Sequence, residues 1–262
     1  MAENRQTPYA LITGATAGIG WELAQLAARE GTPLILVARD ETRLQQRKAE
    51  LAERWSVPVH IISQDLSREG AAQDLFDVVQ ENRWPVDTLV NNAGFGTIGE
   101  FLESELARDQ AMVRVNVLAV VELCKLFGWA FREQGGGRIL NVASTAAYIP
   151  GPRMAVYYAT KAFVLSFSEA LYYEFKPFGI RVTALVPGPT RTEFQARAGM
   201  KNVKLTKILV MMNAAEVARA GWQGLKKGKR VVIPGIFNKL SVYSTRLMLR
   251  AMNARIIGWL QG

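Results

Sequence analysis

The stretch Thr13-Gly14-Ala15-Thr16-Ala17-Gly18-Ile19-Gly20 decides the fold of this chain. The apolar run before it, residues 9–13, is typical of a buried parallel strand. The segment after it, residues 19–30, has helical spacing and stops at a glycine. The stretch is therefore the turn between a first strand and a first helix.

Three glycines in this turn follow the pattern G-x-x-x-G-x-G. We expect Gly14 to permit the tight turn, Gly18 the approach of a pyrophosphate, and Gly20 close packing of the helix on the strand. The helix amino terminus would present free amides to the phosphates. A glycine turn alone is a weak signal, but at the first strand–helix junction of an alternating chain it predicts a dinucleotide site.

The remaining chain alternates in the same way. Such alternation implies right-handed crossovers and a parallel sheet covered on both faces. We therefore predict an α/β protein: a single doubly wound, Rossmann-like domain over residues 1–262, with a mostly parallel seven-stranded sheet. The further strands are expected at residues 33–38, 57–63, 88–90, 138–143, 180–186 and 230–233, and the helices at 41–55, 70–82, 104–134 (with a break near 101–105), 157–178 and 214–226.

Composition excludes several other classes. A single cysteine, Cys124, rules out an internal disulfide, and its apolar surroundings favour a buried small hydrophobe over a nucleophile. The one histidine, His60, lies in a strand-like run, which disfavours a Ser-His-Asp hydrolase. No cluster of metal-ligand residues occurs, so no metal is expected. A polar amino terminus and the lack of a long apolar run predict a cytoplasmic protein.

The positive charge is concentrated at one end of the chain. The formal charge is +9, yet residues 197–262 hold 13 Lys or Arg and one acid, Glu216, which gives +12 and leaves −3 for the rest. This asymmetry points to a function for the carboxy-terminal quarter.

A potential proton-transfer pair follows the fifth predicted strand. Tyr157 and Lys161 are four residues apart, so a helix would place them on one face. A phenol has a pKa of about 10, and an adjacent ammonium group would lower that pKa toward the useful range. Ser144, just past the strand, could hydrogen-bond a carbonyl or alkoxide oxygen. A Tyr–Lys pair at this spacing also occurs on ordinary helix surfaces, so the pair alone decides nothing.

Taken together, these motifs resemble the classical short-chain dehydrogenase/reductase family over roughly residues 8–192. The spacing of Ser144 and Tyr157 fits the family, as does the order of the elements. The matching elements are Thr13 to Gly20, Asn91 to Gly94, Asn116, Ser144, Tyr157 with Lys161, and Pro187-Gly188 with Thr190 and Thr192.

The resemblance implies a catalytic set of Asn116, Ser144, Tyr157 and Lys161. Tyr157 would be the acid/base and Ser144 would orient the substrate oxygen. Lys161 would lower the pKa of Tyr157 and bind the nicotinamide ribose, while Asn116 would hold a water for proton exchange. Tyr158 is expected to face the core or the substrate. The implied cofactor-binding residues are Thr13, Gly14, Thr16, Gly18, Ile19, Gly20, Arg39, Asp65, Leu66, Asn91, Ala93, Gly94, Tyr157, Lys161, Pro187, Gly188, Thr190 and Thr192.

The end of the second strand predicts the type of cofactor. Enzymes that prefer NAD place a carboxylate there, whereas this chain has Ala38 followed by Arg39. An arginine suits a 2′-phosphate, so NADP(H) is expected. The alternative is that Arg39 is merely solvated and Asp40 binds the ribose. Arg43 could help to bind the 2′-phosphate, but the interpretation we favour is an exposed helix residue.

Residues 193–262 form a variable region after the family motifs. Residues 194–212 are either a lid over an apolar substrate or a packed helix. Residues 239–260 have the spacing of one basic amphipathic helix. That helix would close the pocket or an oligomer interface, or contact an anionic membrane or an acidic partner. Nucleic-acid binding is not expected.

The expected function is an NADP(H)-dependent oxidoreductase that transfers a hydride between the nicotinamide and a ketone or secondary alcohol. The interpretation we favour is a carbonyl reductase on a hydrophobic small molecule, acting as a homodimer or homotetramer. The alternatives are a 3-oxoacyl (carrier protein) reductase, and a non-enzymatic NADP-sensing or peripheral membrane protein on the same fold.

Overall fold

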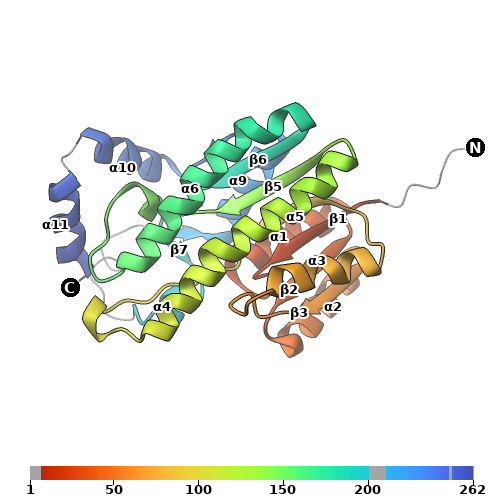
Figure 1. Ribbon diagram of the computed structural model, residues 1–262, viewed down its shortest axis with the longest axis horizontal. Coiled ribbons are helices and arrows are strands. Elements are labelled where there is room, and N and C mark those ends of the chain that lie inside the picture. The colour runs from red at the N-terminus through yellow and green to blue at the C-terminus, as the bar shows by residue number, and fades with distance from the viewer. Residues whose placement is uncertain (1–6, 201–210, 248–249, 262) are drawn as a thin grey trace, which may run out of the picture.

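The computed structural model describes residues 7–200, 211–247 and 250–261. Its centre is a seven-stranded sheet of order β3-β2-β1-β4-β5-β6-β9 (Figure 1). Every pairing in this sheet is parallel, as predicted. The strands are β1 (Tyr9–Thr13), β2 (Leu34–Ala38), β3 (Val59–Ser63), β4 (Val86–Asn91), β5 (Gly137–Val142), β6 (Ile180–Leu185) and β9 (Val231–Val232).

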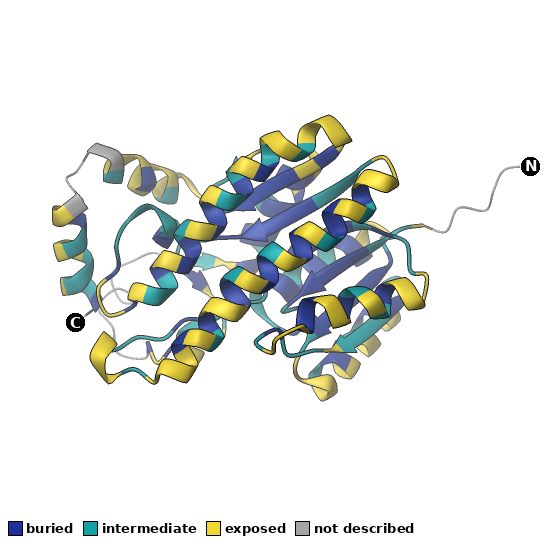
Figure 2. Ribbon diagram, viewed as in Figure 1, coloured by how far each residue is buried: buried dark blue, intermediate teal, exposed yellow. Residues whose placement is uncertain are grey.

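Helices cover both faces of this sheet and bury its apolar side chains (Figure 2). The helices α1 (Gly18–Arg29), α2 (Glu41–Trp55) and α9 (Ala214–Lys226) pack on one face. The opposite face is covered by α3 (Ala71–Glu81), α5 (Ala119–Glu133) and α6 (Ala155–Phe175). This is the doubly wound arrangement, in which ligands bind beyond the carboxyl ends of the strands.

The long helix predicted at residues 104–134 is not uniform. A 3-10 turn (Phe101–Glu103) precedes α4 (Leu106–Val113), and a π-helical turn (Arg114–Leu118) joins α4 to α5. The spacing of apolar residues does not reveal such a turn, because one extra residue per turn barely alters the pattern. Two more 3-10 turns, Thr145–Tyr148 and Lys176–Phe178, flank α6.

An additional parallel ladder, which the sequence did not predict, holds the two ends of the segment that was interpreted as either a lid or a packed helix. Strand β7 (Thr190–Arg191) pairs with β8 (Met212–Asn213), and β7 is followed by the short helix α7 (Phe194–Arg197). Residues 201–210 of the segment lie outside the described residues. The ladder brings residues more than twenty positions apart into register, so a local sequence pattern cannot indicate it.

The prediction of one helix at residues 239–260 was wrong, because the tail contains two helices. They are α10 (Ile236–Leu247) and α11 (Arg250–Gln261), and both lie at the end of the molecule remote from α2 and α3 (Figure 1). The side-chain amide of Asn253 donates to the carbonyl of Thr245 at 3.1 Å and links the two. Within the described part of the chain, no helix has the length and apolar character needed to cross a membrane.

Candidate active site

The glycine turn has the geometry expected of a phosphate-binding junction. Gly14 has a φ of +65°, which an L residue adopts only under strain. A Cβ at Gly20 would collide with the carbonyl oxygen of Gly14, so the helix lies against the turn as closely as the sequence implied. The α1 amino terminus begins at Ala17 without a side-chain cap and has no acid in its first turn. Its first amides are therefore available to an anion.

Asn92 belongs to the predicted motif Asn91 to Gly94 but had no predicted role of its own. Its side-chain amide donates to the carbonyls of Thr13 (3.0 Å) and Gly14 (3.1 Å). In return, the hydroxyl of Thr13 accepts from the backbone amides of Asn92 and Ala93, both at 3.0 Å. These bonds tie the glycine turn to the end of β4. The doubled asparagine was the available signal, since a short amide side chain can replace missing strand partners.

One large cavity of about 1380 Å³ opens beyond the carboxyl ends of the strands. It brings together most of the predicted site residues from seven separate segments. The residues that line it are Gly14, Thr16, Gly18, Ile19, Arg39, Asp65, Leu66, Ala93, Gly94, Ser144, Tyr157, Lys161, Pro187, Gly188, Thr190 and Thr192.

Four predicted site residues lie behind the cavity wall: Thr13, Gly20, Asn91 and Asn116. Thr13 and Gly20 shape the turn as described above. Asn91 is buried, and its side-chain amide donates to Asn141 Oδ1 at 2.9 Å, below the site. The side chain of Asn91 therefore supports the ends of β4 and β5 instead of facing the cavity.

At the end of β2, the cavity is lined by Arg39, Asp40 and Arg43. The carboxylate of Asp40 accepts from the backbone amide of Arg43 at 3.0 Å and caps α2. Asp40 is thus engaged in capping, which weakens the alternative in which it binds the ribose. Arg43, expected to be a solvated helix residue, instead forms a bidentate ion pair with Glu193, 150 residues away. Arg39 is exposed on the wall of the cavity.

Ser144 and Tyr157 form a hydrogen-bonded pair at the other end of the cavity. Ser144 follows β5 and caps the 3-10 turn, accepting from the amide of Ala146 at 3.1 Å. Tyr157 lies in the first turn of α6. Burial raises the pKa of Tyr157 to about 12, and the hydrogen bond from Ser144 opposes that rise only in part. The phenol is therefore fully protonated at neutral pH.

The net pKa of Tyr157 is raised by burial, and the predicted lowering of that pKa by Lys161 stays a prediction. The ammonium nitrogen lies 5.9 Å from the centre of the Tyr157 ring and donates to the carbonyl of Val142 at 2.8 Å. Lys161 is only 6% exposed, and this burial lowers its own pKa to about 8. At this distance the desolvation of the phenol outweighs the attraction between phenolate and ammonium.

Asn116 lies in the π-helical turn. Turns of this kind occur frequently at functional sites. Its side-chain oxygen accepts from the amide of Phe95 (3.1 Å), and its nitrogen donates to the carbonyl of Phe95 (2.9 Å) and to Thr160 Oγ1 (3.1 Å). A Cβ at Gly94 would lie 3.0 Å from this oxygen and 3.4 Å from Lys161 Nζ. The side chain thus joins the loop after β4 to α6, and its predicted role of holding a water stays a prediction.

An apolar chamber covers the Ser144–Tyr157 pair. Tyr158 is buried there, so the expectation that it faces core or substrate agrees with its position, and burial raises the pKa of its phenol. Its hydroxyl accepts from the side chain of Gln261 at 2.8 Å, which brings the end of α11 to the site. The apolar residues that both pack together here and line the cavity are Ala146, Ile149, Met154, Tyr157, Tyr158, Phe194, Met200 and Ile257.

Two residues considered for other chemistries lie outside this cavity. Cys124 is fully buried, and burial raises the pKa of its thiol to about 12, so it is inert. His60 stacks on Trp84 with ring centres 3.9 Å apart, next to Tyr9 on β1. Neither residue can form a nucleophilic site with Ser144.

Comparison with known proteins agrees with this geometry. The model of the short chain dehydrogenase family matches residues 8–202, which is most of the chain. This chain belongs to that family. The short-chain dehydrogenase fold described above is shared by a Sphingobium yanoikuyae short-chain dehydrogenase solved with NADPH. The two are 33% identical with a TM-score of 0.82, over 92% of this chain and 95% of the other.

Two other relatives of this short-chain dehydrogenase are informative. The bulky-bulky ketone specific alcohol dehydrogenase from Comamonas testosteroni is 31% identical with a TM-score of 0.77, over 92% of this chain and 93% of the other. The probable oxidoreductase EphD of Mycobacterium tuberculosis is 34% identical over 189 residues, 72% of this chain. That match covers 32% of EphD, so the chain corresponds to about a third of this relative's length.

Proposed function

We propose that this chain is an NADP(H)-dependent oxidoreductase that interconverts a bulky, apolar ketone and its secondary alcohol, with reduction as the working direction. Family membership supports the reaction class. The lining of the cavity supports the choice of cofactor, the substrate class and the residue roles.

The residues present fit a nicotinamide dinucleotide phosphate. The glycine turn and the uncapped α1 amino terminus suit a pyrophosphate, and Asp65 and Leu66 would contact the adenine. Arg39 and Arg43 would hold the 2′-phosphate, where a carboxylate would otherwise select NAD. A relative that was solved with NADPH supports this assignment. When bound, the nicotinamide supplies or accepts the hydride.

The roles of the chain's own residues follow from their protonation. Tyr157 holds a proton at its phenolic oxygen at neutral pH and would donate it to the substrate oxygen during reduction. Ser144 would hydrogen-bond the same oxygen and orient the carbonyl. Lys161 stays largely protonated below its pKa of about 8, so its positive charge would stabilise the phenolate left after proton transfer.

The chamber above Tyr157 indicates the substrate class. Aliphatic, methionine and aromatic side chains surround the point where a carbonyl would meet Ser144 and Tyr157. Such a lining excludes water and favours the binding of a substrate with a large apolar surface. The likeness to a dehydrogenase specific for bulky-bulky ketones is consistent with this choice.

The observation that carries the proposal is the Ser144–Tyr157 pair, which shares one cavity with buried Lys161 and with Arg39. The test follows nicotinamide absorbance with a panel of bulky ketones, aldehydes and 3-oxoacyl thioesters. We expect the highest kcat/KM with a bulky ketone and NADPH, at least tenfold above NADH. Tyr157→Phe should lower kcat about 10²–10⁴-fold while leaving NADPH binding intact.

The cofactor assignment, the substrate class and the mechanism can each be contradicted separately. An NADH preference would overturn the cofactor assignment, and a preference for 3-oxoacyl thioesters would overturn the substrate class. Activity that survives Tyr157→Phe would overturn the mechanism. NADPH binding without turnover of any substrate would favour a sensor over an enzyme.

A further inference from the structure

The outward face of α10 is apolar. Ile236, Leu240 and Tyr243, spaced four and three residues apart, are all exposed on it. The opposite face, with Asn238, Val242 and Thr245 as its least exposed residues, packs inward. A helix at the surface of a soluble domain normally shows the reverse pattern, with polar residues outward. Burial in the fold therefore does not account for the apolar face of α10.

The outward face of α11 has the same character. Its exposed residues include Met252, Ile256 and Trp259, while Asn253 and Gln261 are buried on its inner side. Figure 1 shows α11 beside α10 at the same end of the molecule, and the bond from Asn253 to Thr245 joins them. The two outward faces together form a surface that we call the tail surface: Ile236, Lys239, Leu240, Tyr243, Met252, Arg255, Ile256 and Trp259.

The charge of this region has one sign. Residues 236–261 contain Lys239, Arg246, Arg250 and Arg255 and no Asp or Glu. Lys239 and Arg255 are exposed within the tail surface itself. Exposed aliphatic and aromatic side chains among basic ones are typical of a helix that lies in the interface of an anionic membrane.

We propose that the tail surface binds reversibly to an anionic lipid bilayer, with the apolar side chains in the headgroup region and the basic ones on lipid phosphates. A second copy of the chain is a worse occupant. A two-fold interface would place the surface against itself, so Lys239 and Arg255 would face the same two cations of the other copy, and residues 236–261 contain no acid to pair with them. An anionic bilayer supplies both the apolar phase and the opposite charge.

The inward faces of the same helices line the cavity. Asn238, Val242 and Thr245 of α10 and Ile257 of α11 all contribute to its wall. Docking would therefore place this part of the cavity next to the bilayer. An apolar ketone could then partition from lipid into the site. This consequence rests on the proposed function, but the binding itself rests only on the exposed residues.

The binding is tested by sedimentation of the full chain with vesicles of phosphatidylcholine alone, or with about 30% phosphatidylserine. We expect binding only to the anionic vesicles at about 50 mM salt, and a loss of at least tenfold at about 500 mM. Lys239→Glu with Arg255→Glu should weaken partitioning roughly twentyfold or more. Leu240→Ser with Trp259→Ser should weaken it at least fivefold.

Matched controls distinguish binding through the tail surface from nonspecific effects of net charge and of exposed apolar side chains. Lys48→Glu with Lys176→Glu alters two exposed cations elsewhere, and both charge variants carry +5 instead of +9. Leu102→Ser with Leu106→Ser removes exposed apolar residues that lie among Glu100, Glu103 and Glu105. Neither control should change vesicle binding by more than about twofold.

Three outcomes would overturn the proposal. They are no binding to anionic vesicles at low salt, equal losses in the tail and control variants, and self-association through the tail surface detected by light scattering in place of vesicle binding. The tail variants should reduce a water-soluble ketone at the wild-type rate. A failure of lipid binding is thereby distinguished from a failure of the proposed reaction.

Discussion

Lys161 shows how one buried charge connects stability with chemistry. Its ammonium group is held 2.8 Å from the carbonyl of Val142, and burial lowers its pKa from 10.5 to about 8. A shift of this size corresponds to about 3 kcal/mol of destabilisation while the group is charged. The fold retains the charge beside Tyr157 although it disfavours folding, which is typical of residues kept for function.

Lys161→Met tests that interpretation. The loss of the buried charge should offset the loss of the donor to Val142, which costs about 1–3 kcal/mol, so the free energy of unfolding near pH 7 should change by less than about 2 kcal/mol. Activity should nevertheless fall by orders of magnitude, since the phenolate loses its counter-charge.

The same variant should also remove a pH dependence. Between pH 8 and 10.5 the unfolded wild-type chain keeps the Lys161 proton while the folded protein loses it, so wild-type stability rises with pH there. Urea unfolding between about pH 7 and about pH 10 should show this rise in the wild type and not in Lys161→Met. Parallel pH profiles of the two proteins would contradict the assignment.

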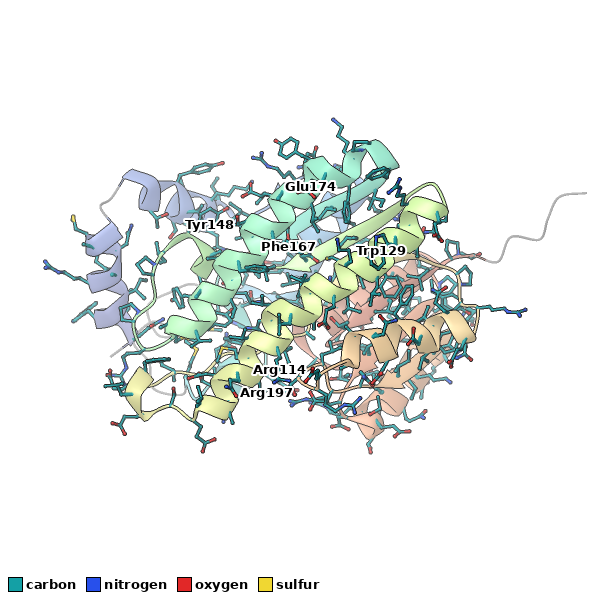
Figure 3. All side chains as sticks on the ribbon, in the orientation of Figure 1. Arg114, Trp129, Tyr148, Phe167, Glu174 and Arg197 are labelled. Carbon is teal, nitrogen blue, oxygen red and sulfur yellow. The ribbon has the colours of Figure 1, made fainter. Side chains whose placement is uncertain are left out.

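At the scale of elements, an ion-pair network connects α2 with α7. Glu193 accepts hydrogen bonds from both terminal guanidinium nitrogens of Arg43 and also pairs with Arg197. Arg197 lies near α4 (Figure 3), where Arg108 donates to its carbonyl at 3.4 Å. The hydrogen bonds from Arg43 lower the pKa of Glu193 to about 2, so the carboxylate is charged at any working pH. Arg43 and Glu193 both line the cavity. If Arg43 holds the 2′-phosphate as proposed, Glu193 would compete with that phosphate for Arg43.

Glu193→Gln should relieve this competition. Because the pair is partly exposed, its strength is modest, and we expect the Kd for NADPH to fall about two- to fivefold. The Kd for NADH, which lacks the phosphate, should stay within the error of the measurement. Glu41→Gln, in the first turn of α2, is the control for loss of an exposed acid. Fluorescence titration measures both Kd values. Equal changes in the Kd for NADPH and the Kd for NADH would show that Glu193 does not act by competing with the 2′-phosphate.

At the scale of the whole molecule, the carboxy-terminal helices close the site that the first 200 residues build. Gln261 reaches Tyr158 at 2.8 Å, and Ile257 completes the apolar chamber. The two helices thus have one face toward the cavity and one toward the outside. In α11, Ile256 is exposed while its neighbour Ile257 lines the cavity, which allows the two faces to be tested separately.

Ile257→Ser and Ile256→Ser form a matched pair for this test. Ile257→Ser places a hydroxyl in the chamber and should raise KM for a bulky apolar ketone about tenfold, with the Kd for NADPH unchanged. Ile256→Ser, on the exposed face, should leave KM unchanged and weaken vesicle binding. Steady-state kinetics with one bulky and one small ketone checks the pair. A KM effect from Ile256→Ser would mean that the two faces are not separate.

The fold and most of the site could be predicted from short segments. The glycine turn, the alternation of strands and helices, and the spacing of Ser144, Tyr157 and Lys161 are local patterns, and all of these elements lie where expected. Oligomeric state and cellular location stay predictions.

The sequence alone determined the architecture, the family and the residues gathered at the cavity, because these depend on periodicity and on motifs within a few residues of each other. Tertiary structure alone decided that Asn92 clamps the turn, that Arg43 binds Glu193, that burial raises the pKa of Tyr157, and that the tail splits into two helices with outward apolar faces. Each of these depends on desolvation or on contacts between segments far apart in the chain, and no local pattern of residues encodes such contacts.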